Sequence, residues 1–110
     1  MVGLDEIQAL SDAIAQRFDP ERIFLFGSHA RGDASDDSDV DLLIVLDFAG
    51  DALDKNVDIW SAVRPAFSVD LVLVRPCDFE TRYRGHDPIV REALDCGKVL
   101  HERRCARVAG

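Results

Sequence analysis

The chain has 110 residues, of which 47% are hydrophobic and 31% charged, and its formal net charge is −8 at pH 7. This length allows a single domain with a modest core, and this composition is typical of a soluble globular protein. The acidic charge argues against non-specific nucleic-acid binding, which needs basic patches, and no apolar stretch approaches the length that crosses a membrane.

The first half of the chain predicts a helix, a strand, a short helical turn and a second strand. Residues 4–18 carry apolar side chains at helical spacing, and Asp19-Pro20 ends that pattern. Residues 22–26 and residues 39–46 are short apolar runs bounded by Gly, Ser or Asp, which is typical of buried strands. Residues 28–32 lie between them and predict a short helical turn.

A second helix is expected over residues 51–64, because apolar side chains recur there every three or four residues. They are Leu53, Val57, Trp60 and Val63. We expect this stripe to face the core, with Trp60 as a core anchor rather than a platform on which a base stacks. Residues 68–74 predict a third strand, in which Asp70 points to the face opposite its apolar neighbours.

The pattern over the last third of the chain is less regular. Residues 76–85 are locally basic and give no clear prediction. Asp87-Pro88 is typical of an N-cap followed by proline at the first helical position, and Gly97 fits the end of that helix. Residues 98–101 can form an edge strand, and residues 102–110 are expected to be a tail.

Three strands with helices between them predict an α/β (α+β) fold, a small mixed β-sheet backed by helices on one face. No repeat or linker is visible, so residues 1–110 are expected to form one domain. Residues 1–10 lack the basic start and long apolar run of a secretory signal, so a cytoplasmic location is expected. Three cysteines without zinc spacing are interpreted as structural or surface thiols: Cys77, Cys96 and Cys105.

Charge is distributed unevenly along the chain. Residues 1–74 contain five basic and fifteen acidic residues, whereas residues 75–110 contain eight basic and six acidic ones. An acidic body with a basic tail would suit a basic protein partner. Ordinary solubility explains the same surplus equally well, so both interpretations stay open.

The strongest chemical pattern is Gly27-Ser28 followed, after ten further residues, by two aspartates. Glycine after a strand permits a tight turn and the close approach of a ligand, and Ser28 would present backbone N–H groups to a phosphate. Asp39 and Asp41 are two apart at the start of a strand, so their side chains share a face. The two carboxylates of such a pair repel each other unless a cation lies between them, and Mg²⁺ prefers oxygen ligands. Either motif alone fits a solvated acidic loop between strands.

This arrangement resembles the signature of the polymerase-beta-type nucleotidyltransferase superfamily. The string GSHARGDASDDSDVDLLIV, residues 27–45, resembles its minimal nucleotidyltransferase subgroup. The matching positions are Gly27, Ser28, Ala30, Arg31, Gly32, Ser38, Asp39, Asp41 and Leu42. The family has a third carboxylate on a later strand, which Asp70 fits. The resemblance covers nearly the whole chain and implies the polymerase-beta-like nucleotidyltransferase fold.

The resemblance also implies a reaction, the attack of an acceptor on the α-phosphate of ATP, with two Mg²⁺ ions assisting. Asp39 and Asp41 would bridge the metals. Asp70 would complete the metal nearer the acceptor and take the proton of the acceptor hydroxyl. Gly27 and Ser28 would hold the β and γ phosphates.

Other polar residues lie close to this motif in the sequence. Arg31 either binds a phosphate of the nucleotide or stabilises the turn through a salt bridge. His29 lies beside the phosphate-binding turn, where a loop histidine without a catalytic role is the simpler interpretation. The spacer acids are expected to face water; they are Asp33, Asp36 and Asp37.

Proteins that this chain resembles are typically antitoxins paired with a HEPN-domain RNase toxin. The family implies transfer of AMP from ATP to a tyrosine of that toxin, which is the first hypothesis. The chain has no room for an acceptor-binding domain, so a partner or a second copy of the chain would dock the acceptor. A binding-only antitoxin that acts by contact is the second hypothesis. Transfer to a small molecule or an RNA end is the third, and the acidic surface disfavours RNA.

Overall fold

The computed structural model describes residues 3–35 and 37–103. The helices in these ranges are α1 (Leu4–Phe18), α2 (Ser28–Arg31), α3 (Ala52–Val63), α4 (Pro76–Arg84) and α5 (Pro88–Cys96). The strands are β1 (Arg22–Phe26), β2 (Val40–Val45), β3 (Val69–Val74) and β4 (Lys98–Glu102). Every strand predicted from the sequence is present, and the edge strand at residues 98–101 is confirmed as β4.

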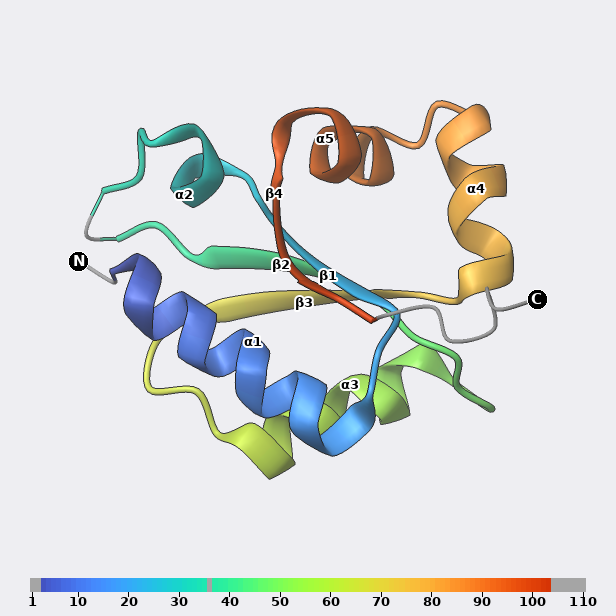
Figure 1. Ribbon diagram of the computed structural model, residues 1–110, viewed down its shortest axis with the longest axis horizontal. Helices are drawn as coiled ribbons and strands as arrows, with labels where there is room; N and C mark the ends of the chain where they lie inside the picture. Colours follow the sequence, from blue (N-terminus) through green and yellow to red (C-terminus); the bar gives the residue numbers. More distant parts are fainter. Residues whose placement is uncertain (1–2, 36, 104–110) are drawn as a thin grey trace.

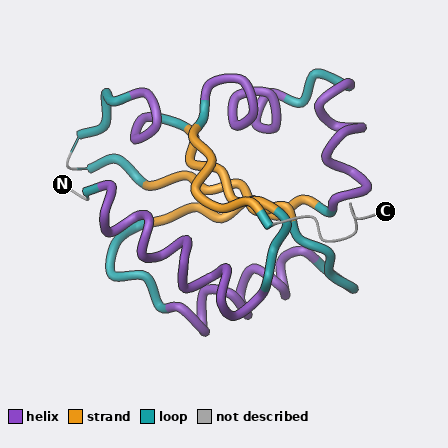
Figure 2. The backbone as a smooth tube through the Cα atoms, in the orientation of Figure 1, coloured by secondary structure: helices purple, strands orange, loops and turns teal. Residues whose placement is uncertain are grey.

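The four strands form one mixed sheet in the order β3-β2-β1-β4 (Figures 1 and 2). β1 pairs antiparallel with both β2 and β4, whereas β2 pairs parallel with β3 across the α3 crossover. The register sets Asp41 opposite Phe26 on one side and opposite Asp70 on the other. The predicted mixed sheet is therefore confirmed, and its central strands converge at one end on the predicted site residues.

Helices cover both faces of the sheet, so the expectation of one covered face is wrong (Figure 1). On one face, α1 and α3 contribute Ile7 and Ile59 to the larger core cluster. On the other face, α5 contributes Val90 to a second cluster, against which Phe79 of α4 packs. The physical reason is that β1 and β2 are apolar on both faces, and each face must be shielded from water.

Most of the apolar stripe of α3 faces solvent, contrary to the prediction, and of its four residues Val63 alone packs against the core. Leu53, Val57 and Trp60 are 68%, 56% and 39% exposed, whereas Ile59 is fully buried. The inward face of α3 also carries Asn56, whose side-chain amide donates a hydrogen bond of 2.7 Å to the Leu71 carbonyl of β3. Trp60 is thus a surface residue beside the sheet and not a core anchor.

The C-terminal third holds one helix that the sequence pattern did not reveal, α4, and one that it did, α5. Asp87 caps α5 as predicted, because its carboxylate accepts hydrogen bonds from the N–H groups of Ile89 (3.0 Å) and Val90 (3.2 Å). Cys77 and Cys96 are exposed free thiols. Cys105, Asp36 and the predicted tail beyond residue 103 lie outside the described residues. No helix in the described ranges is long and apolar enough to cross a membrane.

Candidate functional site

The turn from β1 into α2 is shaped by a close approach of backbone to carboxylate. Gly27 has φ +80°, and a Cβ built on it would collide with Oδ2 of Asp41. A side chain at this position would be both strained and blocked, so glycine alone fits here. α2 begins directly afterwards at Ser28, which brings the predicted phosphate-binding turn against the start of β2.

Two of the predicted carboxylates lie on neighbouring parallel strands at the same level. Asp41 of β2 and Asp70 of β3 are register partners, and both are on the sheet face that α5 covers. Asp41 is half-buried, whereas Asp70 is exposed, so a buried structural role for Asp70 is excluded. Asp39 lies just before β2 and is also exposed.

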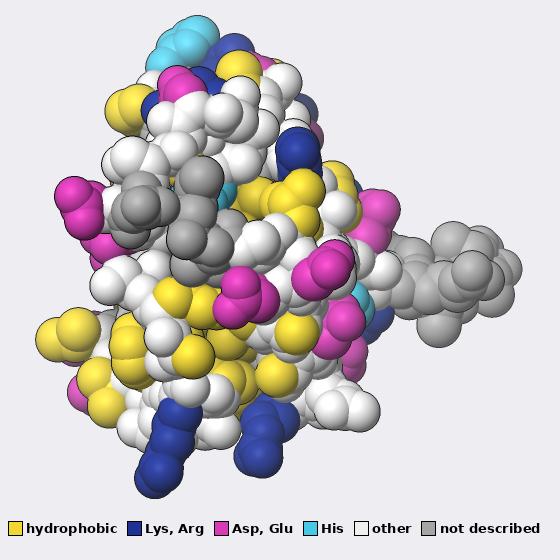
Figure 3. All heavy atoms as spheres, turned by 90° about the vertical axis from the view of Figure 1, so that its left-hand side faces the viewer, with side chains coloured by type: hydrophobic (Ala, Val, Ile, Leu, Met, Phe, Trp, Pro, Cys, Tyr) yellow, Lys and Arg dark blue, Asp and Glu magenta, His cyan; other side chains and the backbone are white. Residues whose placement is uncertain are grey.

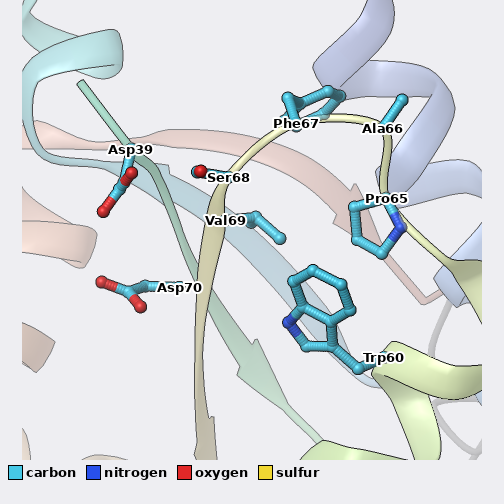
Figure 4. A pocket seen from close by; sticks show the side chains of 8 residues that line it. All are labelled: Asp39, Trp60, Pro65, Ala66, Phe67, Ser68, Val69 and Asp70. Carbon is cyan, nitrogen blue, oxygen red and sulfur yellow. The ribbon is translucent and has the colours of Figure 1, made fainter. Parts of the chain in front are cut away.

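Two hollows meet at Asp70. The first, here called the Gly27 hollow, is lined by Gly27, Ser28, Arg31, Asp41, Asp70 and Glu92 together with apolar side chains. The second, here called the Trp60 hollow, contains Asp39, Asp70 and Trp60 with residues 65–69. Figure 4 shows the carboxylates of Asp39 and Asp70 pointing to one side of β3, while Trp60 and Pro65 lie on the other. The end of the molecule drawn in Figure 3 shows acidic side chains among exposed hydrophobic ones.

The acidic side chains of the site repel one another, and this repulsion affects the pKa of Asp41. Burial raises the pKa of Asp41 above its ordinary value, and the carboxylates of Asp70, Asp39 and Glu92 raise it further, in that order. His29 acts in the opposite direction. The carboxylates therefore lie close enough to oppose one another's ionisation, which is the situation that a bound cation would relieve.

The donor chemistry suits a hard cation, since Asp39, Asp41 and Asp70 supply only carboxylate oxygens. Within residues 3–35 and 37–103, however, no three acidic, His or Cys side chains are arranged closely enough to hold a metal ion. The residues fit Mg²⁺ in type and in mutual repulsion. Of the three, Asp39 and Asp70 are exposed and Asp41 is half-buried.

Two residues of α2, Arg31 and His29, make structural contacts. Arg31 forms ion pairs with Glu92 (2.8 Å) and Asp33 (3.3 Å), so the salt-bridge role considered for it is present. His29 is buried, and its Nε2 lies 3.3 Å from the carbonyl of Ser38. His29 thereby ties α2 to the loop that leads into β2, which favours a structural role for this histidine.

Glu92 is a site residue that sequence reasoning missed. Its Oε2 accepts hydrogen bonds from the Gly27 backbone N–H (3.1 Å) and from Nη1 of Arg31 (2.8 Å). Its partners lie more than sixty residues away in the chain, and on α5 it occupies an ordinary polar position. No local pattern could have revealed it, because the contact arises only when α5 packs beside β1.

Comparison with known proteins agrees with the fold and the motif. Residues 7–100 match the family model described as the nucleotidyltransferase domain. Among curated proteins, the protein adenylyltransferase MntA of Thermococcus cleftensis is 42% identical over 48 residues, covering 40% of this chain and 48% of that protein. The match thus spans about half the length of the curated relative.

Two solved structures share the architecture. A proposed nucleotidyltransferase from Sulfolobus solfataricus is 26% identical, with a TM-score of 0.56 and 71% of each chain covered. A toxin-antitoxin structure with AMP-PNP is 20% identical, with a TM-score of 0.56 and coverage of 88% of this chain and 74% of that one; it supports the fold alone. The family resemblance read from residues 27–45 is confirmed. Since the family model covers most of its length, this chain belongs to the nucleotidyltransferase domain family.

Proposed function

We propose that this protein is a protein adenylyltransferase that transfers AMP from ATP to a tyrosine hydroxyl of a HEPN-domain toxin. The observation that carries the proposal is the Gly27 hollow, where the turn at Gly27 and Ser28 faces Asp41 and Asp70. Both hollows have a volume of about 490 Å³, within the range of about 300–1,000 Å³ common for small-molecule sites. The name of the MntA relative, a protein adenylyltransferase, supports transfer of an adenylyl group to a protein.

In this proposal the nucleotide lies in the Gly27 hollow. The backbone N–H groups at Gly27 and Ser28 hold the β and γ phosphates, and Arg31 adds a positive charge beside them. The α-phosphate is thereby directed toward Asp41 and Asp70. Asp39, Asp41 and Asp70 would hold two Mg²⁺ ions, which supply charge neutralisation at the attacking and leaving oxygens when bound.

The acceptor enters from the Asp70 side, where the Trp60 hollow begins. The tyrosine oxygen attacks the α-phosphorus, and its bond to that phosphorus forms as the bond to the pyrophosphate oxygen breaks. Asp70 takes the proton of the tyrosine hydroxyl, and pyrophosphate leaves with the bonding electrons. Asp70 suits this role because it is exposed and lies in both hollows.

The test begins with the gene beside the one that encodes this chain. If that gene encodes a small helical protein with an Arg-x₄-His motif, the two proteins are co-expressed, separated and mixed with ATP and Mg²⁺. Mass spectrometry of the partner should show the mass of one or more AMP groups on a tyrosine. The matched variants are Asp41→Ala, Asp70→Ala and, as a control for loss of a surface carboxylate, Asp58→Ala on α3.

Asp41→Ala and Asp70→Ala should abolish both the transfer and the protection of cells, while the two proteins still associate. Asp58→Ala should behave as the wild type. If Asp41→Ala protects cells fully and the wild type adds no mass, the protein neutralises its partner by contact alone. If AMP is found on a small molecule or an RNA end instead, the acceptor in this proposal is wrong.

A further inference from the structure

The Gly27 hollow already contains an anionic group, the side chain of Glu92. One carboxylate oxygen of Glu92 accepts both the Gly27 backbone N–H (3.1 Å) and Nη1 of Arg31 (2.8 Å). Glu92 extends from α5. Val90 and Ala93 of the same helix are buried in the core, so packing fixes the position of α5. The contact is thus a defined bridge from α5 to the turn and not a chance surface encounter.

The two donors that Glu92 occupies are the ones that the proposed function assigns to phosphate. A backbone N–H can be directed at one strong acceptor at a time. A phosphate oxygen at hydrogen-bond distance from Gly27 N would also lie beside the Glu92 carboxylate, and the two negative charges would repel each other. Glu92 and a triphosphate therefore compete for the Gly27 N–H and for Nη1 of Arg31.

We propose that Glu92 is a built-in phosphate surrogate, which holds Gly27 and Arg31 until it swings away to let a nucleotide triphosphate bind. This inference rests on the proposed function, since it assumes that the Gly27 hollow takes a polyphosphate. It assigns to Glu92 a specificity role: a ligand must supply enough anionic contacts to displace an internal carboxylate. A triphosphate bound to divalent metal does so, whereas a single phosphate group offers too few.

The geometry supports displacement of the side chain alone. The Glu92 side chain is about one-third exposed, at 36%, so a rotation about its side-chain bonds carries the carboxylate into water without moving α5. Released Arg31 keeps its second partner, Asp33, at 3.3 Å, which leaves the guanidinium beside the hollow. The Arg31 guanidinium can therefore stay beside the hollow when the Glu92 side chain rotates away.

The experiment measures binding of AMP-PNP with Mg²⁺, without any acceptor, by isothermal titration calorimetry. Inorganic tripolyphosphate serves as a second probe that lacks the nucleoside. Glu92→Gln removes the charge and keeps an acceptor oxygen, and Glu92→Ala removes the whole carboxylate at a helical position where alanine is favourable. Glu80→Gln is the matched control, because Glu80 of α4 pairs with Arg84 at the same 2.8 Å but lies outside both hollows.

Both Glu92 variants should bind AMP-PNP and tripolyphosphate several-fold more tightly than the wild type, and Glu80→Gln should be unchanged. If the wild type binds AMP-PNP and the Glu92 variants bind it equally or more weakly, Glu92 merely positions Arg31 and this inference is overturned, while the proposed function stands. If no variant binds either probe, the proposed function and this inference fail together. Thermal melting of each variant verifies that it is folded.

Discussion

At the scale of single residues, Gly27 combines a positive φ with a close contact to the Asp41 side chain. Gly27→Ala would place a methyl group in strained backbone at φ +80° and against the Asp41 carboxylate. We expect it to lower the free energy of unfolding by about 1–3 kcal/mol and to abolish AMP-PNP binding. Urea denaturation and calorimetry measure the two effects.

Gly32→Ala is the control for Gly27→Ala. Gly32 also has a positive φ, +86°, but nothing lies within 4 Å of a Cβ built there. Gly32→Ala should lower the free energy of unfolding because of its strained backbone, but it should not reduce nucleotide binding. Equal loss of binding in both variants would mean that positive φ, and not the contact with Asp41, explains the result.

Asp41 gives a second prediction, based on pH. Burial, followed by Asp70 and Asp39, raises its pKa above the ordinary value of 3.8. A carboxyl group with a raised pKa binds more protons in the folded protein, so its contribution to stability is fully present below its unfolded pKa and is lost as pH rises through the folded one. Asp41→Asn lacks this loss, and its stability relative to the wild type should increase with pH across that window.

Urea denaturation from about pH 4 to about pH 7 tests this linkage. Asp58→Asn on α3 is the control for the removal of one exposed negative charge. We expect apo Asp41→Asn to be at least as stable as the wild type at neutral pH. A loss of several kcal/mol would show instead that the Asp41 carboxylate supports the fold.

At the scale of elements, α5 depends on its cap. Burial alone would raise the pKa of Asp87, but hydrogen bonds from Val90 and Ile89 and the Arg82 guanidinium outweigh it and hold the pKa below its ordinary value. The stabilisation is therefore present at neutral pH and is lost as pH falls through the folded pKa. Asp87→Ala should lower the free energy of unfolding by about 0.5–2 kcal/mol.

Asp87→Asn separates the cap from the ion pair, because asparagine keeps the capping oxygen and loses the charge that faces Arg82 at 2.9 Å. It should cost less than Asp87→Ala in the same urea titration. If the two substitutions cost the same, the ion pair with Arg82 and not the cap stabilises this end of α5.

Elements whose pattern is local could be predicted from the sequence, and elements defined by packing could not. β1, β2 and β3 are short apolar runs with polar boundaries, so their positions could be inferred, whereas the place of Asp70 beside Asp41 was an expectation from the family resemblance. α4 was missed because Phe79 and Tyr83 are its only apolar anchors toward the core. The predicted orientation of α3 was wrong because Leu53, Val57 and Trp60 form a regular apolar pattern, whereas the inward face pairs Ile59 with the polar Asn56.

The residues of the candidate site likewise fall into those that a local pattern predicts and one that only packing brings in. Gly27, Ser28 and Asp41 lie within one continuous stretch, and their spacing together with two apolar runs was enough to predict that they meet, whereas Asp39 lies in the Trp60 hollow. Glu92 joins them only through the packing of α5 beside β1, which connects residues far apart in the chain. No spacing rule operates over that distance.

At the scale of the whole molecule, ligand binding should be visible as stability. A ligand that binds only the folded form raises the free energy of unfolding by about 2.7 kcal/mol at a hundred times its dissociation constant. For a domain of this size, that corresponds to a rise in melting temperature of roughly 10–20 °C. We expect Mg²⁺ to raise the melting temperature by part of this amount and ATP to add to it.

The Mg²⁺ effect should shrink in Asp41→Asn and persist in Asp58→Asn, as followed by differential scanning fluorimetry with EDTA as the metal-free reference. A wild-type melting temperature that responds to neither Mg²⁺ nor ATP at millimolar concentration would contradict the metal-nucleotide site. A full Mg²⁺ response in Asp41→Asn would place the cation elsewhere on this acidic protein.

The order of the sheet leaves β3 as an outer strand, and this has a consequence for how copies of the protein behave in a crowded solution. An outer strand offers unpaired backbone groups on which a strand of another molecule can add, and such addition leads to aggregation. The Leu71 carbonyl is one of these groups, and the Asn56 side chain already occupies it. Because this carbonyl is already paired, an incoming strand would find no free acceptor at that point of the outer strand.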